Sequence, residues 1–144
     1  MRKLILAAAL ASIGALVVAS PAFAIDHHFT VLSKQKSGHR VGQNAFRFKD
    51  KLLDPHNRHD RVGRDRGKCR FKPHNRKVKC HATVHLNGEI GGFGNMRVRG
   101  DLDRGPDHLV VLGGSRQFDG VAGKVTIHST RNRKIDKLHF DLVR

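Results

Sequence analysis

Apolar and polar side chains alternate in short stretches along most of this 144-residue chain. The clearest stretch covers residues 77–86, KVKCHATVHL, in which every second side chain is apolar or small. Residues 45–49 (AFRFK) and 137–142 (KLHFDL) repeat the pattern. Because a two-residue period places successive side chains on opposite faces of a β-strand, each stretch predicts a strand with one buried and one solvated face.

Eight strands of this kind are predicted after residue 24, and no helix is predicted among them. Turn signals separate the strands: Ser37-Gly38, Asn87-Gly88 and a Pro-His-Asn-Arg sequence that occurs at 55–58 and again at 73–76. A charged stretch, 99–107, has no apolar pattern and predicts a loop. The predicted strands cover residues 25–33, 45–50, 62–71, 77–86, 90–98, 109–112, 121–127 and 135–143. We therefore predict an all-β fold, an eight-stranded antiparallel barrel, with a two-sheet sandwich as the alternative.

The alternation also predicts which side chains fill the barrel. Phe46, Phe48 and Asp50 share one face of their strand, while Arg47 and Lys49 share the other. Since phenylalanine belongs inside, Asp50 is carried inward to the mouth, where burial raises its pKa or a basic neighbour pairs with it. The candidate basic neighbours are Lys51 and Arg64. Seven more side chains are predicted to point inward by the same reasoning: Val84, Leu86, Met96, Val125, Ile127, Leu138 and Phe140.

The two cysteines of the chain are predicted to form a disulfide. Cys69 and Cys80 are equidistant from the midpoint of the predicted turn between His74 and Asn75. A simple hairpin therefore places them directly opposite one another, at a Cα separation of about 4.5 to 5.5 Å that a disulfide accepts. A pair of free thiols in the core is the alternative.

The N-terminal residues have the pattern of a secretory signal peptide. Arg2 and Lys3 precede an apolar run from Leu4 to Ala19, and the small-x-small sequence Ala22-Phe23-Ala24 follows. We predict cleavage after Ala24, which divides the chain into a signal peptide, 1–24, and one domain, 25–144. No later stretch is apolar enough to span a bilayer. The predicted location is extracellular, or periplasmic.

The predicted mature chain is strongly basic. Loss of Arg2 and Lys3 leaves 26 basic side chains against 12 acidic ones, a formal charge of +14. Such a surface attracts anionic partners, among them an anionic cell-envelope polymer, and the attraction weakens with salt. A merely solvated basic surface is the alternative. Specific nucleic-acid binding is not predicted, because the chain has no Trp or Tyr on which bases could stack.

Neither a metal site nor a cofactor site is predicted. His81 and His85 lie four residues apart on one strand, about 13 Å, too far to share an ion. His56 and His59 are closer, but no acidic or cysteine cluster completes a ligand set. Phosphate-loop and dinucleotide motifs are absent from the sequence, so no cofactor is expected. Catalytic residues cannot be assigned from scattered histidines.

A glycine-rich segment, 109–128, resembles the fingerprint of allene oxide cyclases and, more loosely, of dirigent proteins. The residues that carry this resemblance are Gly113, Gly114, Ser115, Phe118, Gly120, Val121, Gly123 and Val125. Further matches are spread along the chain: Phe48, Lys51-Leu52, Val62-Gly63, Gly67-x-Cys69, Gly88-x-Ile90 and Lys137-Leu138-x-Phe140. The resemblance implies a calycin-like eight-stranded barrel whose cavity holds a hydrophobic, carboxylate-bearing small molecule.

The resemblance also implies positions in a pocket. Phe48 and Cys69 stand where the family has pocket-lining residues, and Asp50 stands where the plant enzymes have an asparagine that helps to hold a water. The alternation along the strands and the resemblance to allene oxide cyclases together predict a ligand pocket. Its predicted lining is Phe46, Phe48, Asp50, Cys69 and Met96.

Two functions are compatible with this sequence. The family's first strand supplies a glutamate and the following turn a proline, and residues 25–40 contain neither. We therefore interpret the chain as a secreted basic barrel that binds a hydrophobic or anionic ligand or surface. The alternative is an isomerase or cyclase that acts on a hydrophobic small molecule in the cavity. A vacant cavity of about 300 Å³ or more favours a ligand inside the barrel.

The secreted protein is expected to begin at Ile25 and to carry the Cys69–Cys80 bridge. Intact-mass measurement of secreted material checks both expectations. A mass two hydrogen atoms above that of the bridged chain would show free thiols, and a different N-terminus would refute the predicted cleavage site.

Overall fold

The protein was described from a computed structural model, which defines residues 27–72, 77–102 and 107–144. The predicted signal peptide and cleavage site, the second Pro-His-Asn-Arg turn at 73–76 and part of the predicted 99–107 loop lie outside the described residues. In the described part of the chain, no helix is long and apolar enough to cross a membrane.

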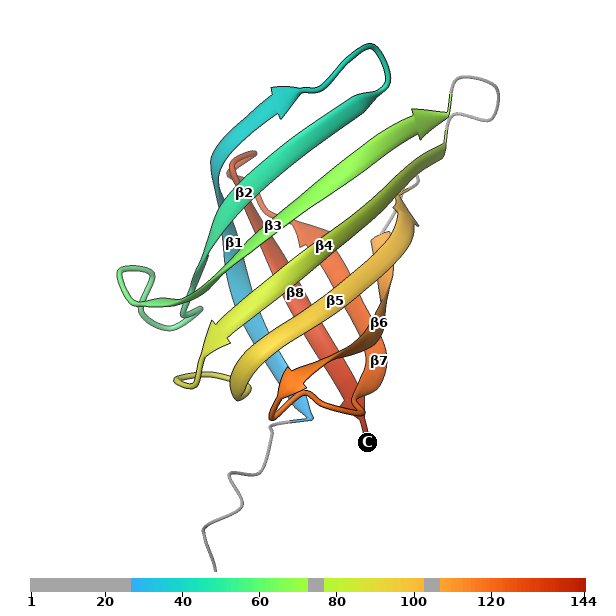
Figure 1. The fold of residues 1–144 in the computed structure, drawn as a ribbon. Helices are drawn as coiled ribbons and strands as arrows, with labels where there is room; N and C mark the ends of the chain where they lie inside the picture. Colours follow the sequence, from blue (N-terminus) through green and yellow to red (C-terminus); the bar gives the residue numbers. More distant parts are fainter. Residues whose placement is uncertain (1–26, 73–76, 103–106) are drawn as a thin grey trace, which may run out of the picture.

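Eight antiparallel strands form a closed barrel in which each strand pairs with its neighbours in sequence and β1 pairs with β8 (Figure 1). The predicted all-β barrel is confirmed and the sandwich is excluded. The strands are β1 (His28–Arg40), β2 (Ala45–Leu53), β3 (Arg61–Lys72), β4 (Lys77–Asn87), β5 (Phe93–Leu102), β6 (Asp107–Arg116), β7 (Ala122–Ser129) and β8 (Ile135–Val143). Closure gives every strand two paired neighbours, although in the printed registers the end of β1, from Ser37 to Arg40, pairs with β2 alone.

Several predicted boundaries are wrong. The strand expected from residue 90 begins at Phe93, and the strand expected to end at residue 112 continues through Gly113, Gly114 and Ser115, which were assigned to a turn. The expected turn at Ser37-Gly38 is part of β1, which continues to Arg40 past an irregularity in register between Gln35 and Ser37. Gly38 stays in the strand because the ring of Phe46 covers it. Likewise, the charged residues 99–102 extend β5 in place of the predicted loop, since ladder pairing tolerates polar side chains that face water.

The barrel interior is packed solid at one end. This end carries the connections after β2, β4 and β6 and the start of β1, at the bottom of Figure 1. Phe29 and Phe140 stack there with ring centroids 4.6 Å apart, and Phe118, from the glycine-rich segment after β6, is fully buried. Further buried apolar side chains complete this core: Val31, Leu52, Val62, Leu86, Met96, Val121 and Leu142.

The predicted disulfide is present. Cys69 on β3 and Cys80 on β4 are register partners with a Cα separation of 4.1 Å, and they are bonded. The bridge joins two strands near the opposite end of the barrel, where packing is sparser. It therefore holds together a region that the solid core does not reach.

Truncation of one phenylalanine at each end should separate the packed half from the open half. Phe118→Ala leaves a closed void and is expected to cost about 3 to 5 kcal/mol of unfolding free energy. Phe48→Ala should cost less than about 2 kcal/mol, because this half-buried ring already borders an open cavity. Denaturant unfolding followed by circular dichroism measures both, with Arg47→Ala on the outer face as the control. Equal losses for the two phenylalanines would contradict this division of the interior.

Candidate ligand-binding cavity

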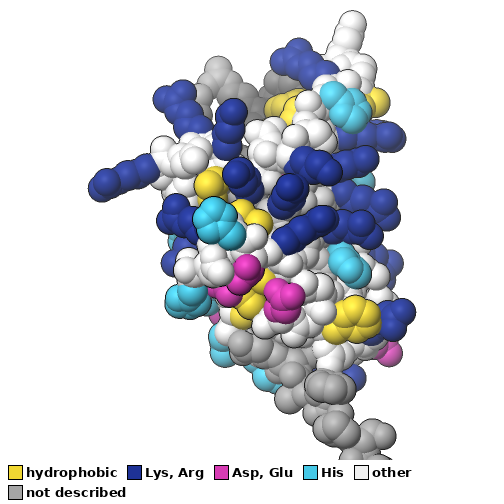
Figure 2. All heavy atoms as spheres, turned by 90° about the vertical axis from the view of Figure 1, so that its left-hand side faces the viewer, with side chains coloured by type: hydrophobic (Ala, Val, Ile, Leu, Met, Phe, Trp, Pro, Cys, Tyr) yellow, Lys and Arg dark blue, Asp and Glu magenta, His cyan; other side chains and the backbone are white. Residues whose placement is uncertain are grey.

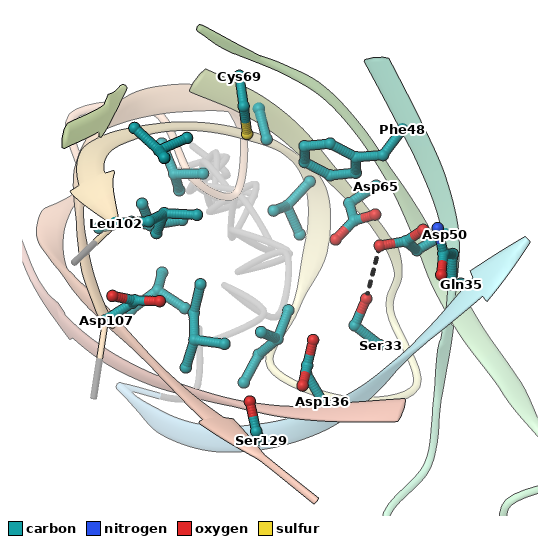
Figure 3. Close-up of a pocket in the computed structure, with 18 of the residues that line it drawn as sticks. Ser33, Gln35, Phe48, Asp50, Asp65, Cys69, Leu102, Asp107, Ser129 and Asp136 are labelled. Atoms are coloured by element: carbon teal, nitrogen blue, oxygen red, sulfur yellow. Dashed lines mark hydrogen bonds between the residues drawn. The ribbon is translucent and has the colours of Figure 1, made fainter. Parts of the chain in front are cut away.

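The open end of the barrel encloses a cavity of about 480 Å³. The wall is formed by inward side chains of all eight strands together with the β7–β8 connection, and its floor by the packed core (Figure 3). Apolar residues dominate the lower wall: Val84, Val98, Leu109, Val125, Leu138 and Phe140. The volume lies within the range of small-molecule sites, about 300 to 1,000 Å³.

Two phenylalanines of β2 form one wall of the cavity because glycines on the neighbouring strands leave room for their rings. The ring of Phe46 covers Gly38 on β1, and that of Phe48 covers Gly67 on β3. A Cβ atom at Gly67 would lie 2.5 Å from Phe48 Cζ and 2.6 Å from the carbonyl oxygen of His81. A side chain at position 67 would thus force the Phe48 ring away from the wall and into the cavity.

A pair of carboxyl groups faces the aromatic wall. Asp50 on β2 and Asp65 on β3 are register partners, and both side chains point into the cavity (Figure 3). Ser33 on β1 donates a hydrogen bond of 3.1 Å from Oγ to Asp50 Oδ2. The Oδ1 atoms of both aspartates are buried and have no hydrogen-bond partner among the described residues. A bound ligand with suitably placed donors could supply the missing partners.

Burial makes both carboxyls harder to ionise. Loss of hydration raises the pKa of Asp65 to about 7, and the negative charge of Asp50 adds to the shift. Loss of hydration also raises the pKa of Asp50, while the Ser33 hydroxyl opposes the increase. Asp65 therefore keeps its proton up to about neutral pH, since a second negative charge beside Asp50 in a largely apolar wall is unfavourable.

More acidic and polar groups lie near the mouth, including Asp107, Ser129 and Asp136 (Figure 3). Burial raises the pKa of Asp136, whereas a hydrogen bond with Ser129 lowers it. Arg133 and Lys134, from the connection between β7 and β8, also border the cavity. The interior of this basic protein is consequently acidic, with its cations at the rim.

Four of the five predicted pocket residues line the cavity: Phe46, Phe48, Asp50 and Cys69. The fifth, Met96, also points inward, but it is fully buried in the packed half, below the cavity. Asp50 has the expected raised pKa through burial, and it forms no ion pair with Lys51 or Arg64 in the structure.

Asp65 was not singled out from the sequence. It is nevertheless two residues from Gly67 and four from Cys69, so the period of two places all three on the same face of β3. The glycines on either side of Asp65 hide this alternation, because they carry no apolar side chain to mark the inner face. That Asp65 lies beside Asp50 follows from the register between β2 and β3, which the sequence alone does not show.

No group of three or more metal-ligating side chains occurs within residues 27–72, 77–102 and 107–144.

No known protein family and no curated protein matches this chain. Among solved structures, a pyocyanin demethylase superimposes with a TM-score of 0.63 and 21% sequence identity, over 81% of this chain and 99% of that one. The pterocarpan synthase dirigent protein GePTS1 superimposes with a TM-score of 0.62 and 15% identity, over 80% of this chain and 84% of that one. The three chains share one fold. It is the barrel implied by the resemblance to allene oxide cyclases and dirigent proteins.

Replacement of Asp65 should stabilise the protein in a pH-dependent way. The folded protein holds the Asp65 proton more tightly than the unfolded chain does, so its stability falls as the pH rises from about 4 to about 7. Asn at position 65 cannot ionise, so Asp65→Asn removes this pH-dependent loss of stability. The gain in unfolding free energy should therefore be small at low pH and grow to at most about 4 kcal/mol above pH 7.

Denaturant unfolding at pH 4 and pH 8 measures this change, with Asp119→Asn on the exposed β6–β7 connection as the control. A gain of equal size at both pH values would contradict the raised pKa of Asp65.

Proposed function

We propose that the protein binds a flat, largely apolar small molecule in the barrel cavity. In this proposal, a hydrogen-bond donor or a positive charge on the ligand faces Asp50 and Asp65. The observation that carries the proposal is the pair of buried carboxyl oxygens without partners, at the wall of a cavity of about 480 Å³.

The shape of the cavity supports a flat ligand. Phe46 and Phe48 offer ring faces along one wall, and aliphatic side chains form the opposite wall. Aromatic faces bind planar molecules by stacking, with a gain beyond the burial of apolar surface. Because Gly38 and Gly67 leave room for the Phe46 and Phe48 rings, the wall is formed without a ligand, which lowers the entropic cost of binding.

The charge of the cavity supports a cationic or donor group on the ligand. A ligand carboxylate beside Asp50 and Asp65 would add a third negative charge to a wall that already disfavours two. A hydrophobic ligand that carries a carboxylate would have to direct it toward the rim, where Arg133 and Lys134 lie. We therefore favour the donor-bearing ligand over the carboxylate-bearing one.

A secreted or periplasmic location forms part of the proposal. The Cys69–Cys80 bridge supports it, because disulfides persist mainly in oxidising compartments. The signal-like N-terminal sequence points the same way.

A second candidate function, proton transfer by an isomerase or cyclase, is favoured by the carboxyl pair. In such a reaction, Asp50 as carboxylate takes a proton from one atom of the substrate while protonated Asp65 gives one to another. The proton gained by Asp50 then passes back to Asp65, and the pair is restored without a co-reactant. A carboxyl with a pKa of about 7 suits both roles near neutral pH. The two solved structures of the same fold are named as a demethylase and a synthase, so this barrel does serve as an enzyme scaffold in other proteins.

Two tricyclic dyes of similar shape test the proposed binding site: cationic 9-aminoacridine and anionic anthracene-9-carboxylate. Fluorescence titration in about 0.5 M salt suppresses binding to the basic exterior. We expect 9-aminoacridine to bind one site per barrel and more tightly than the carboxylate. Asp50→Asn combined with Asp65→Asn should weaken 9-aminoacridine at least tenfold, because it removes a charge-assisted contact.

Asp119→Asn combined with Asp101→Asn removes the same number of carboxyls from the exterior and should leave the affinity unchanged. Phe48→Ala should weaken both dyes. Tighter binding of the carboxylate, or equal effects of the inner and outer double variants, would overturn the proposed ligand chemistry.

A further inference from the structure

A dense array of basic side chains covers the outer faces of β1 to β5. We call it the basic face. Its members all project from the barrel toward solvent: Lys34, Arg47, Lys49, Lys51, Arg64, Arg66, Lys68, Arg97 and Arg99. Figure 2 shows Lys and Arg crowded over the upper part of this side of the molecule, with few acidic side chains, all of them lower down. The basic face lies on the other side of the sheet from the cavity wall.

The register of β2 and β3 brings like charges directly together. The opposed pairs are Arg47 with Lys68, Lys49 with Arg66, and Lys51 with Arg64. Like charges in directly opposed positions of an antiparallel ladder destabilise the sheet. Among the described residues, the ion pairs that form involve His28, Lys79, Lys124 and His139, and none of the basic face. The array therefore opposes folding, which is typical of a surface kept for a binding function.

Two neighbouring hollows run between these side chains. One, of about 580 Å³, is bordered by Arg47, Lys68, His81 and Arg97. The other, of about 300 Å³, is bordered by the cations Lys51, Arg61 and Arg64, and by Asp50 and Asp65 at its base. Lys49, Arg66 and Thr83 line both hollows. Together the hollows form a path across the strands, from β1 to β5, with cations on both sides.

We propose that the basic face binds a linear phosphate polymer, a single flexible chain that lies along the two hollows. The backbone positions that carry these side chains are about 4.8 Å apart on neighbouring strands and about 6.7 Å apart two residues along one strand, so side chains from adjacent positions can contact the same phosphate. Arginine adds the planar, two-pronged hydrogen bonding that suits phosphate oxygens. A chain spanning both hollows neutralises the opposed pairs and removes the repulsion between them.

The surface chemistry favours such a chain over two other polyanionic partners. Single-stranded nucleic acid relies on exposed aromatic side chains for stacking. Phe48 is the one phenylalanine of the described chain that borders a hollow, and it is half-buried beside the cavity. Membrane binding relies on apolar side chains that insert between lipids. The exposed large apolar residues of the described chain are Phe71, Phe93, Val110, Leu112 and Val143. Phe71 lines the cavity, and among these five Leu112 alone borders a hollow, so the basic face offers a membrane too little apolar surface to insert.

Binding to inorganic polyphosphate, measured over a range of salt concentrations, tests the proposal. The test variant combines Lys49→Gln, Arg66→Gln and Arg97→Gln. Each lost contact should lower the slope of log affinity against log salt by about 0.7 to 0.9, hence by about 2 to 3 in total. The affinity at about 0.1 M salt should fall at least tenfold. Calorimetry should show an unchanged or higher Tm, because opposed like charges have been removed.

The control variant removes the same charges elsewhere, through Lys137→Gln, Arg131→Gln and Arg144→Gln, all exposed and outside the basic face. It should alter the affinity less than threefold. Equal losses for the two variants would overturn the proposal in favour of net charge alone. Tighter binding, per phosphate, of duplex DNA or of anionic phospholipid vesicles would overturn the choice of partner. The inner double variant of Asp50 and Asp65 should bind polyphosphate at least as tightly as the native protein, because it removes carboxyls beside one hollow and no cation. A loss of affinity there would refute a surface that binds through its cations.

Lysine acetylation of the unaltered protein provides a test that does not depend on folding of a variant. Polyphosphate should protect Lys49, Lys51 and Lys68 from acetylation, while Lys124 and Lys137 remain reactive. Uniform protection of all five lysines, or protection of none, would overturn the proposal.

Discussion

The two-residue period of the β-strand is the constraint on which both sites of this protein depend. Along β2, Phe48 and Asp50 face the cavity, while Lys49 and Lys51 face solvent. Because one ladder fixes both sides of the wall, a shift of register by one residue would exchange the cavity lining for the basic face. Closure of the barrel holds this register on every strand, and the Cys69–Cys80 bridge fixes it at the open end.

Both sites act against stability, and the rest of the barrel compensates. Asp65 is buried without a cationic partner among the described residues, and like charges oppose one another on the outside. Two features stabilise the barrel against these costs. Phe29 and Phe140 stack at the packed end, and the disulfide joins β3 and β4 near the open end. Departures from the usual rules for a stable sheet therefore concentrate in β2 and β3, where function is proposed, and are absent from the packed core.

The sequence predicted the fold well because alternation is a local signal. It also placed Phe48 and Asp50 on the inner face, since both follow from a single strand. Alternation does not show how far along the barrel axis an inward side chain lies. For this reason Met96 was assigned to the pocket although it lies in the packed half. Nor could the sequence pair Asp50 with Asp65, because that contact depends on the register between two strands. The turn assigned to Ser37-Gly38 was wrong because the glycine is covered by a ring from β2, a tertiary contact.

The position of the carboxyl pair follows from the energetic cost of burying charge. One step further down the barrel, the register partners Leu52 and Gly63 belong to the water-free core, and Leu52 is fully buried. A carboxyl pair there would have neither water nor a ligand to hydrogen-bond, and unpaired buried charge is strongly unfavourable. One step further up, Phe48 and Gly67 form the aromatic wall. The aspartates thus occupy the deepest level at which a cavity still reaches them, which is also where a ligand on the phenylalanine wall would meet them.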